Sequence, residues 1–297
     1  MSDLKQAIQR EYLKCASDPV HFMRKYCTIQ HPTKGKVKFD LYPFQEKCLT
    51  EFKDNRYNII LKARQLGIST LSAGYALWMM LFHNDKNILV IATGKDTAKN
   101  LVTKVRVMYE NLPSWLKTGT EEINKLSLRF TNGSQIKAIA SNESAGRSEA
   151  LSLLIIDEAA FIDKIGEIWT AAQQTLATGG DCIALSTPNG VGNWFHKTYV
   201  EADTGVNDFY PTLLPWQVHP DRDEEWFEKE TRNMSRREIA QELECNFNTS
   251  GDTVIHPDDI AWLQEQIKEP IYRTGYDRNF WIWEKYQEGT SYLLVAD

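Results

Sequence analysis

A stretch of nine residues, Lys62 to Thr70, combines residue types that bind phosphate groups. It lies between an apolar run suited to a β-strand, residues 57–61, and an apolar run of helical character, residues 71–82. The phosphate-binding loop with the pattern G-x-x-x-x-G-K-[ST] joins a strand to a helix, surrounds phosphates with backbone N–H groups and offers a hydroxyl to Mg²⁺. Gly67 and Ser69 occupy the required places, so the stretch predicts such a loop.

The lysine of this pattern is missing, because Ile68 stands directly before Ser69. Lys62 stands instead at the first glycine position, at the entrance of the loop. The long stem of a lysine at this place could bring its point charge back over the phosphates. Arg64, inside the loop, is a second cation that could replace the missing lysine, and the sequence leaves both open.

Two adjacent carboxylates, Asp157 and Glu158, follow the fully apolar run of residues 153–156. Such a run is typical of a buried parallel strand that delivers polar side chains at its carboxyl end. In P-loop ATPases an aspartate at this place holds the Mg²⁺ shell, and an adjacent glutamate can polarise the attacking water. A core strand followed by a helix with an acidic first turn gives the same pattern. The combination with the loop, in this order, favours ATP and Mg²⁺ as ligands.

Predicted strands and helices alternate around these residues. The strands are expected at 57–61, 88–92, 153–156 and 183–186, and the helices at 71–82, 96–111 and 166–176. This alternation predicts an α/β fold with a mainly parallel sheet flanked by helices. Residues 126–130 and 135–140 flank a turn and predict a β-hairpin.

The chain is expected to divide into four segments. Residues 1–40 form a helical appendage that ends in an irregular link over 31–40, and residues 41–205 form the core. Residues 206–255 form a small lid subdomain with a strand at 210–214 and helices at 223–234 and 236–245. Residues 256–297 form a linker with a helix at 258–267 and a final apolar strand.

Composition excludes several classes of protein. No apolar run approaches the roughly 20 residues needed to span a bilayer, and the amino terminus lacks a signal-peptide region, so we expect a cytoplasmic protein without a membrane partner. The five cysteines are far apart and form no C-x-x-C pair, which argues against a zinc site. A net charge of −6 argues against a wholly basic, nucleic-acid-wrapping surface. Local basic clusters, such as Lys95, Lys99, Lys104 and Arg106, are typical of solvated faces.

Four motifs together resemble the large terminase subunit of tailed bacteriophages, closest to the T4 type. They are Tyr42-Pro43-Phe44-Gln45, the loop Lys62–Thr70, the run Leu154-Ile155-Ile156-Asp157-Glu158-Ala159-Ala160-Phe161, and Ser186-Thr187-Pro188-Asn189-Gly190. The resemblance covers residues 20–297. It implies a P-loop NTPase fold of the ASCE type that hydrolyses ATP to move double-stranded DNA into a procapsid, followed by a nuclease domain of the ribonuclease H type.

The resemblance also implies roles for individual residues. Gln45 matches an adenine-reading glutamine, although a surface glutamine on a helix would look the same in the sequence. The nucleotide would be bound by Lys62, Arg64, Gln65, Leu66, Gly67, Ile68, Ser69 and Thr70, with Ser69 and Asp157 on Mg²⁺, Glu158 and Arg64 catalytic, and Thr187, Pro188 and Asn189 as a coupling segment that senses the γ-phosphate. Arg147 matches a proposed arginine finger from a neighbouring subunit; the alternative is a loop arginine paired with a surface acid.

Partners follow from the same resemblance. They are double-stranded DNA, a portal protein, a small terminase subunit and further copies of the chain in a pentameric ring on the procapsid, in the cytoplasm of an infected bacterial host.

The family nuclease begins with a strand that ends in a metal-binding aspartate, and Asp297 matches that place. Cleavage with two metal ions needs several carboxylates around metals roughly 4 Å apart. No residue follows Asp297, so we expect a shortened chain with an incomplete metal site and without nuclease activity.

Two other functions share parts of this pattern. A helicase-type DNA translocase has the same glutamine, loop and acidic strand, but it needs a second motor-like domain, for which residues 205–297 are too short. A nucleotide-binding assembly module that does not hydrolyse ATP has no need of Glu158 beside Asp157.

Overall fold

The computed structural model of the chain describes residues 2–31, 33–140, 150–250, 259, 262–263, 265–275 and 280–290. The chain divides into two compact units, Met1–Asp252 and Thr253–Asp297. The expected appendage, core and nearly all of the expected lid therefore share one unit. None of the helices in the described ranges combines the length and the apolar character needed to cross a bilayer.

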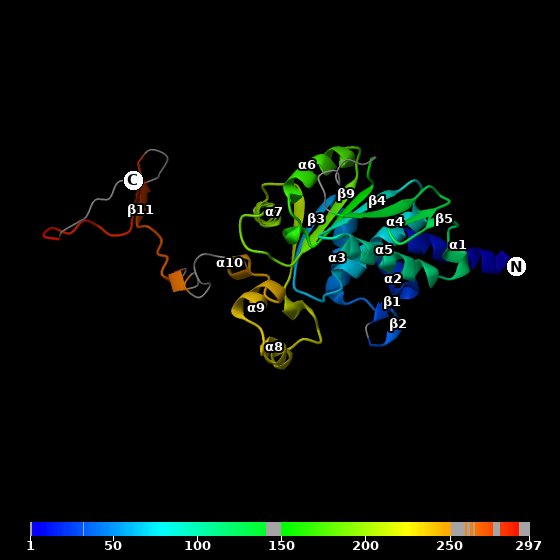
Figure 1. Cartoon of the computed structure of the whole chain (residues 1–297), viewed down its shortest axis with the longest axis horizontal. Helices are drawn as coiled ribbons and strands as arrows, with labels where there is room; N and C mark the ends of the chain where they lie inside the picture. The colour runs from blue at the N-terminus through cyan, green and yellow to red at the C-terminus, as the bar shows by residue number, and fades with distance from the viewer. Residues whose placement is uncertain are drawn as a thin grey trace. The chain divides into compact units, whose positions relative to one another are not determined.

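The first unit is built around an eight-stranded sheet with the order β10-β3-β9-β8-β4-β7-β6-β5 (Figure 1). Its strands are β3 (Tyr57–Lys62), β4 (Asn87–Ala92), β5 (Thr120–Ile123), β6 (Ser127–Phe130), β7 (Gln135–Ala140), β8 (Leu153–Asp157), β9 (Asp181–Ser186) and β10 (Phe209–Leu214). Pairing is parallel from β10 to β7, and β6 and β5 continue the sheet antiparallel. The predicted α/β class, the mainly parallel sheet and the β6–β7 hairpin are confirmed.

The central strands are apolar and buried because helices cover both faces of the sheet. Strand β8 is buried at every position, as expected for a parallel strand in the middle of an α/β sheet. The register aligns the carboxyl ends of the central strands: Asp157 pairs with Ala92 on one side and Leu185 on the other, and Leu61 pairs with Ser186. The loops that follow β3, β8 and β9 therefore meet at one edge of the sheet.

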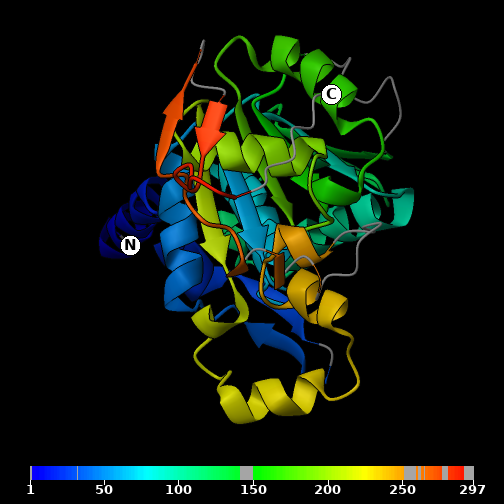
Figure 2. The same cartoon turned by 90° about the vertical axis from the view of Figure 1, so that its left-hand side faces the viewer.

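Helices lie on both faces of the sheet (Figures 1 and 2). One face carries α3 (Pro43–Asp54), α4 (Ile68–Phe82) and α5 (Lys95–Glu110), and the other carries α6 (Ile165–Leu176) and α7 (Trp194–Asp203). Right-handed crossovers explain this division, because the order of the strands runs in one direction from β3 to β7 and returns from β8 to β10.

The amino-terminal helices α1 (Ser2–Ser17) and α2 (Pro19–Tyr26) pack against α4. Trp78 in α4 donates from Nε1 to the carbonyl of Cys15 at 2.8 Å. The rings of Tyr12 and Phe22 meet Phe82 edge to face, with centroid distances of 5.1 and 5.3 Å. The expected appendage thus completes the core over α4.

Residues 31–40 are more regular than expected. Strands β1 (Thr28–His31) and β2 (Gly35–Lys38) form an antiparallel hairpin. Gly35 has a φ of 70°, a conformation that glycine adopts without steric cost and that lets the chain reverse. The prediction of an irregular link was therefore wrong for β2.

Strand β10 belongs to the core sheet, so the sheet continues past the boundary expected at residue 205. Residues 215–250 lie outside the sheet and are called the lid subdomain below. Its helices are the short 3₁₀ turn η3 (Trp216–Val218), α8 (Glu224–Thr231), α9 (Arg236–Glu242) and α10 (Phe247–Ser250). Asp223 caps α8, and Ser235 with Glu238 forms a capping box for α9. The two predicted charged helices are confirmed.

The second unit contains a short antiparallel hairpin of β11 (Tyr272–Thr274) and β12 (Phe280–Ile282). Helical residues at 259, 262–263 and 265 fall within the helix expected over 258–267. The strand expected at 291–297 lies outside the described residues.

Candidate nucleotide site

The loop Lys62–Thr70 leaves β3 and enters α4 at the carboxyl edge of the sheet. Gly67 precedes α4 with a φ of 75°, and a side chain there would place its Cβ 2.8 Å from Gln45 Nε2. Both the backbone conformation and the available space therefore require glycine. The first N–H groups of α4 lack intrahelical partners, which makes this helix start suited to binding an anion.

The loop before Gly67 offers further donors. Gln65 has a φ of 58°. The N–H groups of Gln65, Leu66 and Gly67 carry no hydrogen bond to the described part of the chain. Successive N–H groups in turn conformations form concave binding sites for phosphate. The predicted loop is therefore shaped to hold phosphate oxygens.

Ser69 and Asp157 form the first of two polar pairs at this edge. Ser69 Oγ donates to Asp157 Oδ1 at 3.0 Å. Burial, and then the neighbouring charge of Glu158, raise the pKa of the Asp157 carboxyl, against the opposing effect of Lys62. A hydroxyl and a carboxylate are oxygen ligands of the kind Mg²⁺ prefers, and a divalent cation would offset the cost of burying this carboxylate. The two residues therefore fit the predicted Mg²⁺ role.

Lys62 and Glu158 form the second pair. Lys62 Nζ lies 2.9 Å from Glu158 Oε1, and the Lys62 side chain is only 7% exposed. The side chain of Lys62 therefore reaches from the end of β3 to the loop after β8. This places the entrance lysine beside the predicted catalytic glutamate.

Glu158 is held from a third strand as well. Its backbone is left-handed, with a φ of 55°. Its Oε2 lies 3.4 Å from Ser186 Oγ and 3.4 Å from the N–H of Thr187, both of which donate to it. Ser186 Oγ also accepts the N–H of Ala160 at 3.1 Å. The carboxylate is thus oriented by groups at the ends of β3 and β9.

Arg64 points in a different direction from Lys62. Its Nε lies 2.9 Å from Glu242 Oε2 in α9, and its side chain is 68% exposed. In this geometry Lys62, and not Arg64, supplies the buried cation next to Glu158. A catalytic role for Arg64 remains a prediction.

Gln45 lies under the loop and is 3% exposed. Its Nε2 donates to the carbonyl of Leu66 at 2.9 Å, and its Oε1 accepts the N–H of Tyr42 at 3.1 Å. The alternative of a surface glutamine is therefore wrong, because Gln45 braces the loop. Recognition of adenine by Gln45 remains a prediction.

Two of the predicted nucleotide-binding residues have apolar side chains in the core. Ile68 is 1% exposed and Leu66 is 2% exposed. Only their backbone groups can face a phosphate. Thr70 is half-buried in the first turn of α4.

The predicted coupling segment, Thr187 to Asn189, links the site to the end of the lid subdomain. Asn189 Nδ2 donates to the carbonyl of Ala160 at 3.2 Å, two residues beyond Glu158. The next N–H, that of Gly190, donates to the buried Ser250 Oγ at 3.0 Å. A chain of contacts therefore runs from Glu158 to α10.

Sequence reasoning missed several residues of the site. Lys104 was interpreted as a surface charge, but it is half-buried; burial lowers the pKa of its ammonium, against the opposing charge of Asp157. Arg222 and Glu242 contact the loop from the lid subdomain. None of the three lies in a motif. Ser186 stood inside the quoted motif without a role.

Two predicted site residues, Arg147 and Asp297, lie outside the described residues. Their roles as arginine finger and nuclease metal ligand remain predictions.

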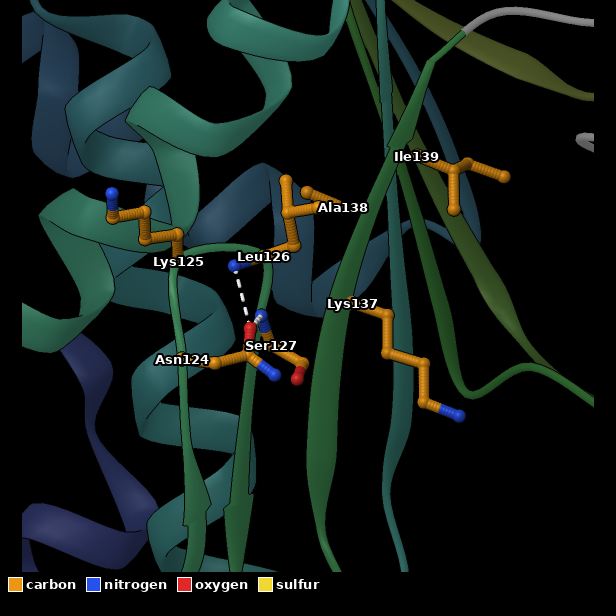
Figure 3. Close-up of a pocket in the computed structure, with 7 residues that line it drawn as sticks. All are labelled: Asn124, Lys125, Leu126, Ser127, Lys137, Ala138 and Ile139. Atoms are coloured by element: carbon orange, nitrogen blue, oxygen red, sulfur yellow. Dashed lines mark hydrogen bonds between the residues drawn. The ribbon is translucent and has the colours of Figure 1, made fainter.

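A cavity of about 540 Å³ lies at another part of the sheet, between the β5–β6 loop and β7. Its lining residues are Asn124, Lys125, Leu126, Ser127, Lys137, Ala138 and Ile139. In Figure 3, Lys137 and Ile139 point away from Leu126. Strand β7 is separated from β3 by three other strands, so this cavity is distinct from the loop Lys62–Thr70.

The fold and the site together define a class. A phosphate loop after β3, an Asp-Glu pair after β8 and a strand, β9, between them are the arrangement of a P-loop NTPase of the ASCE type. Solved structures share this fold. They include the large terminase ATPase domain of Thermus phage P74-26 (TM-score 0.55, 22% identity, 67% of this chain and 92% of that chain). The large terminase of a thermophilic bacteriophage in complex with ADP (0.58, 13%, 70% and 54%) and the HK97 large terminase (0.57, 17%, 84% and 51%) are also similar.

The family follows from the sequence. Residues 59–261, more than half of the chain, match the family described as terminase large subunit, T4likevirus-type, N-terminal. A relative named "Probable terminase, large subunit gp28" from Escherichia phage Mu is 30% identical over 149 residues. That match covers 43% of this chain and 26% of the Mu protein, so the chain spans about a quarter of that relative. The chain belongs to the terminase large subunit family, and the resemblance seen in its motifs is confirmed.

Proposed function

We propose that this chain is the ATPase motor domain of a viral DNA-packaging terminase, and that it hydrolyses ATP at the loop Lys62–Thr70. The observation that carries the proposal is the meeting of two polar pairs at one sheet edge: Ser69 with Asp157, and Lys62 with Glu158. Membership of the terminase family and the fold shared with large terminase ATPase domains support it.

The phosphates bind to backbone N–H groups of the loop and of the first turn of α4. Gln65, Leu66 and Gly67 offer donors that have no other hydrogen bond in the described ranges. Lys62 contributes the cation that the position of Ile68 lacks.

Ser69 and Asp157 hold Mg²⁺, which, when bound, neutralises charge on the β- and γ-phosphate oxygens. Glu158 accepts a hydrogen bond from the attacking water and orients it. Lys62 and Thr187 fix the direction of this carboxylate from opposite sides.

Three further roles belong to the proposal. Gln45 reads the adenine edge in addition to bracing the loop. Arg147 acts as an arginine finger in a neighbouring subunit. The contacts from Thr187–Asn189 to Ala160, and from Gly190 to Ser250, transmit the nucleotide state to the lid subdomain.

The motor would translocate double-stranded DNA in the cytoplasm of the infected host. Its partners would be a portal protein, a small terminase subunit and further copies of the chain in a ring, which we propose to be a pentamer.

The central test compares wild type with Glu158→Gln. We expect nucleotide affinity within about 3-fold of wild type and a single-turnover hydrolysis rate lower by about 10²–10⁴, because the lost group acts on the water. Glu167→Gln is the matched control, since Glu167 is an exposed acid on α6. Wild-type hydrolysis in Glu158→Gln contradicts the assignment. Tight ATP binding by wild type without hydrolysis, under conditions of subunit assembly, indicates a binding module instead.

A further inference from the structure

Three successive carbonyl groups of the phosphate loop are held by side chains from outside the loop. Arg222, in the lid subdomain, donates from Nη1 to the carbonyl of Arg64 at 3.2 Å and from Nη2 to that of Gln65 at 3.3 Å. Gln45, in α3, donates to the carbonyl of Leu66 at 2.9 Å. The loop is therefore gripped from the lid subdomain and from α3.

The direction of these carbonyls determines the direction of the neighbouring N–H groups. The described residues contain no cis peptide bond, and in a planar trans peptide the C=O and the next N–H point in opposite directions. When the carbonyls of Arg64 and Gln65 turn toward Arg222, the N–H groups of Gln65 and Leu66 turn away from it. These are two of the donors available for phosphate.

Arg222 controls the backbone of Gln65 in particular. The Arg64 carbonyl belongs to the peptide before Gln65, and the Gln65 carbonyl belongs to the peptide after it. One guanidinium that binds both carbonyls therefore sets both backbone torsions of Gln65. The φ of Gln65 is 58°, a conformation that non-glycine residues rarely adopt and that persists only when the surroundings hold it.

The guanidinium of Arg222 is itself fixed within the lid subdomain. It lies over the ring of Trp226, 4.5 Å from the centroid. The N–H of Trp226 is bound by Asp223 at the start of α8, at 2.8 Å. A second lid contact joins the N–H of Arg64 to the carbonyl of Glu242 at 2.7 Å. The position of Arg222 thus reports the position of α8 and α9.

We propose that Arg222 is a positioning residue for nucleotide binding. It locks Gln65 in the left-handed conformation, aims the N–H groups of Gln65 and Leu66 at the phosphates, and makes nucleotide affinity depend on the lid subdomain. The proposal rests on the proposed function of the loop. Because loop N–H groups of this kind cradle the α- and β-phosphates, the contribution of Arg222 is the same for ADP and ATP.

The first test replaces Arg222 by methionine, which keeps an apolar stem over Trp226 and removes the donors. We expect the dissociation constants of ADP and ATP both to rise about tenfold, measured by titration calorimetry, because a strained residue is released from its hold. The melting temperature without nucleotide should match that of the control Lys229→Ala, which removes an exposed cation from the same helix, α8.

The second test uses Gln65→Gly. Glycine adopts a positive φ at little cost, so the loop needs Arg222 less, and Arg222→Met in this background should raise both dissociation constants only about 2- to 3-fold. A contact of Arg222 with the nucleotide itself, or a general effect on folding, predicts the same loss in both backgrounds.

Three results would overturn the positioning role: no loss of affinity in Arg222→Met, a loss confined to ATP, or an equal loss in the Gln65→Gly background. Should Arg222→Met fail to fold, Arg222→Lys serves in the same cycle, because an ammonium keeps the charge but lacks the fork that binds two carbonyls. Wild type that binds neither nucleotide refutes the proposed function itself. Wild type that binds both, with Arg222→Met unchanged, refutes only the role of Arg222.

Discussion

Replacement of Lys62 by methionine is expected to weaken ATP binding far more than the same replacement at Arg64. The two residues are two positions apart and both carry a positive charge, so the sequence treats them as alternatives. In the structure the Lys62 side chain is 7% exposed and 2.9 Å from Glu158. The Arg64 side chain is 68% exposed and paired with Glu242. Burial and direction therefore distinguish them.

The magnitudes follow from these environments. A hydrogen bond from a buried cation to a charged acceptor contributes about 1.5–3 kcal/mol, which corresponds to roughly 10- to 150-fold in affinity for Lys62→Met. An exposed ion pair contributes about 0–1 kcal/mol, so Arg64→Met should change affinity by at most about 5-fold. Hydrolysis should fall further in Lys62→Met, because Glu158 loses the group that fixes its direction.

The assay measures the dissociation constant of ATP and the single-turnover rate in the two variants and in wild type. Circular dichroism melting serves as the control for folding, and both variants should melt close to wild type. The interpretation is refuted by an Arg64→Met variant that binds ATP as weakly as Lys62→Met, or by normal binding and hydrolysis in Lys62→Met.

Two further predictions concern the metal and the pH. Asp157→Asn should remove the Mg²⁺ dependence of nucleotide binding, since Asp157 is the proposed metal ligand; the affinity measured in EDTA should stay within about 3-fold of wild type, and a retained tenfold gain on adding Mg²⁺ would contradict it. In the amino-terminal helices, Glu11 Oε1 accepts hydrogen bonds from Lys25 and His21, and these lower the pKa of Glu11 from 4.5 to about 2. A lowered carboxyl pKa stabilises the folded state above pH 4.5, and this contribution is lost as the pH falls toward about 2. Glu11→Gln should therefore melt below wild type at neutral pH, by about 2–4 °C; a difference that does not shrink below pH 4.5 would contradict the ionised role of Glu11.

Local patterns were sufficient to predict the framework of the site. Uninterrupted apolar runs predicted β3, β4, β8 and β9, and the glycine-containing segment between β3 and α4 predicted a loop. Parallel strands bring their carboxyl ends to one edge, so residues that follow β3 and β8 were expected to meet. Ser69 and Asp157 do meet, although 88 positions separate them.

Contacts between distant segments could not be predicted in this way. Strand β10 ends the sheet beside β3 because its backbone pairs with Tyr57–Lys62, and nothing in its own sequence names that partner. Arg222 and Glu242 reach the phosphate loop from short helices whose caps predict only where they begin. Charged side chains of this kind look like solvated faces until the packing of the lid subdomain is known.

The choice between Lys62 and Arg64 shows where the sequence alone stops. Their types and spacing established that the loop carries two cations and lacks the usual lysine. The direction of each side chain depends on the register of β3 with β9 and of β9 with β8, and on the position of α9. Register places Lys62 opposite Glu158, and α9 draws Arg64 to Glu242. Side-chain direction is set by backbone pairing over distances that no local pattern records, so only the tertiary structure decided it.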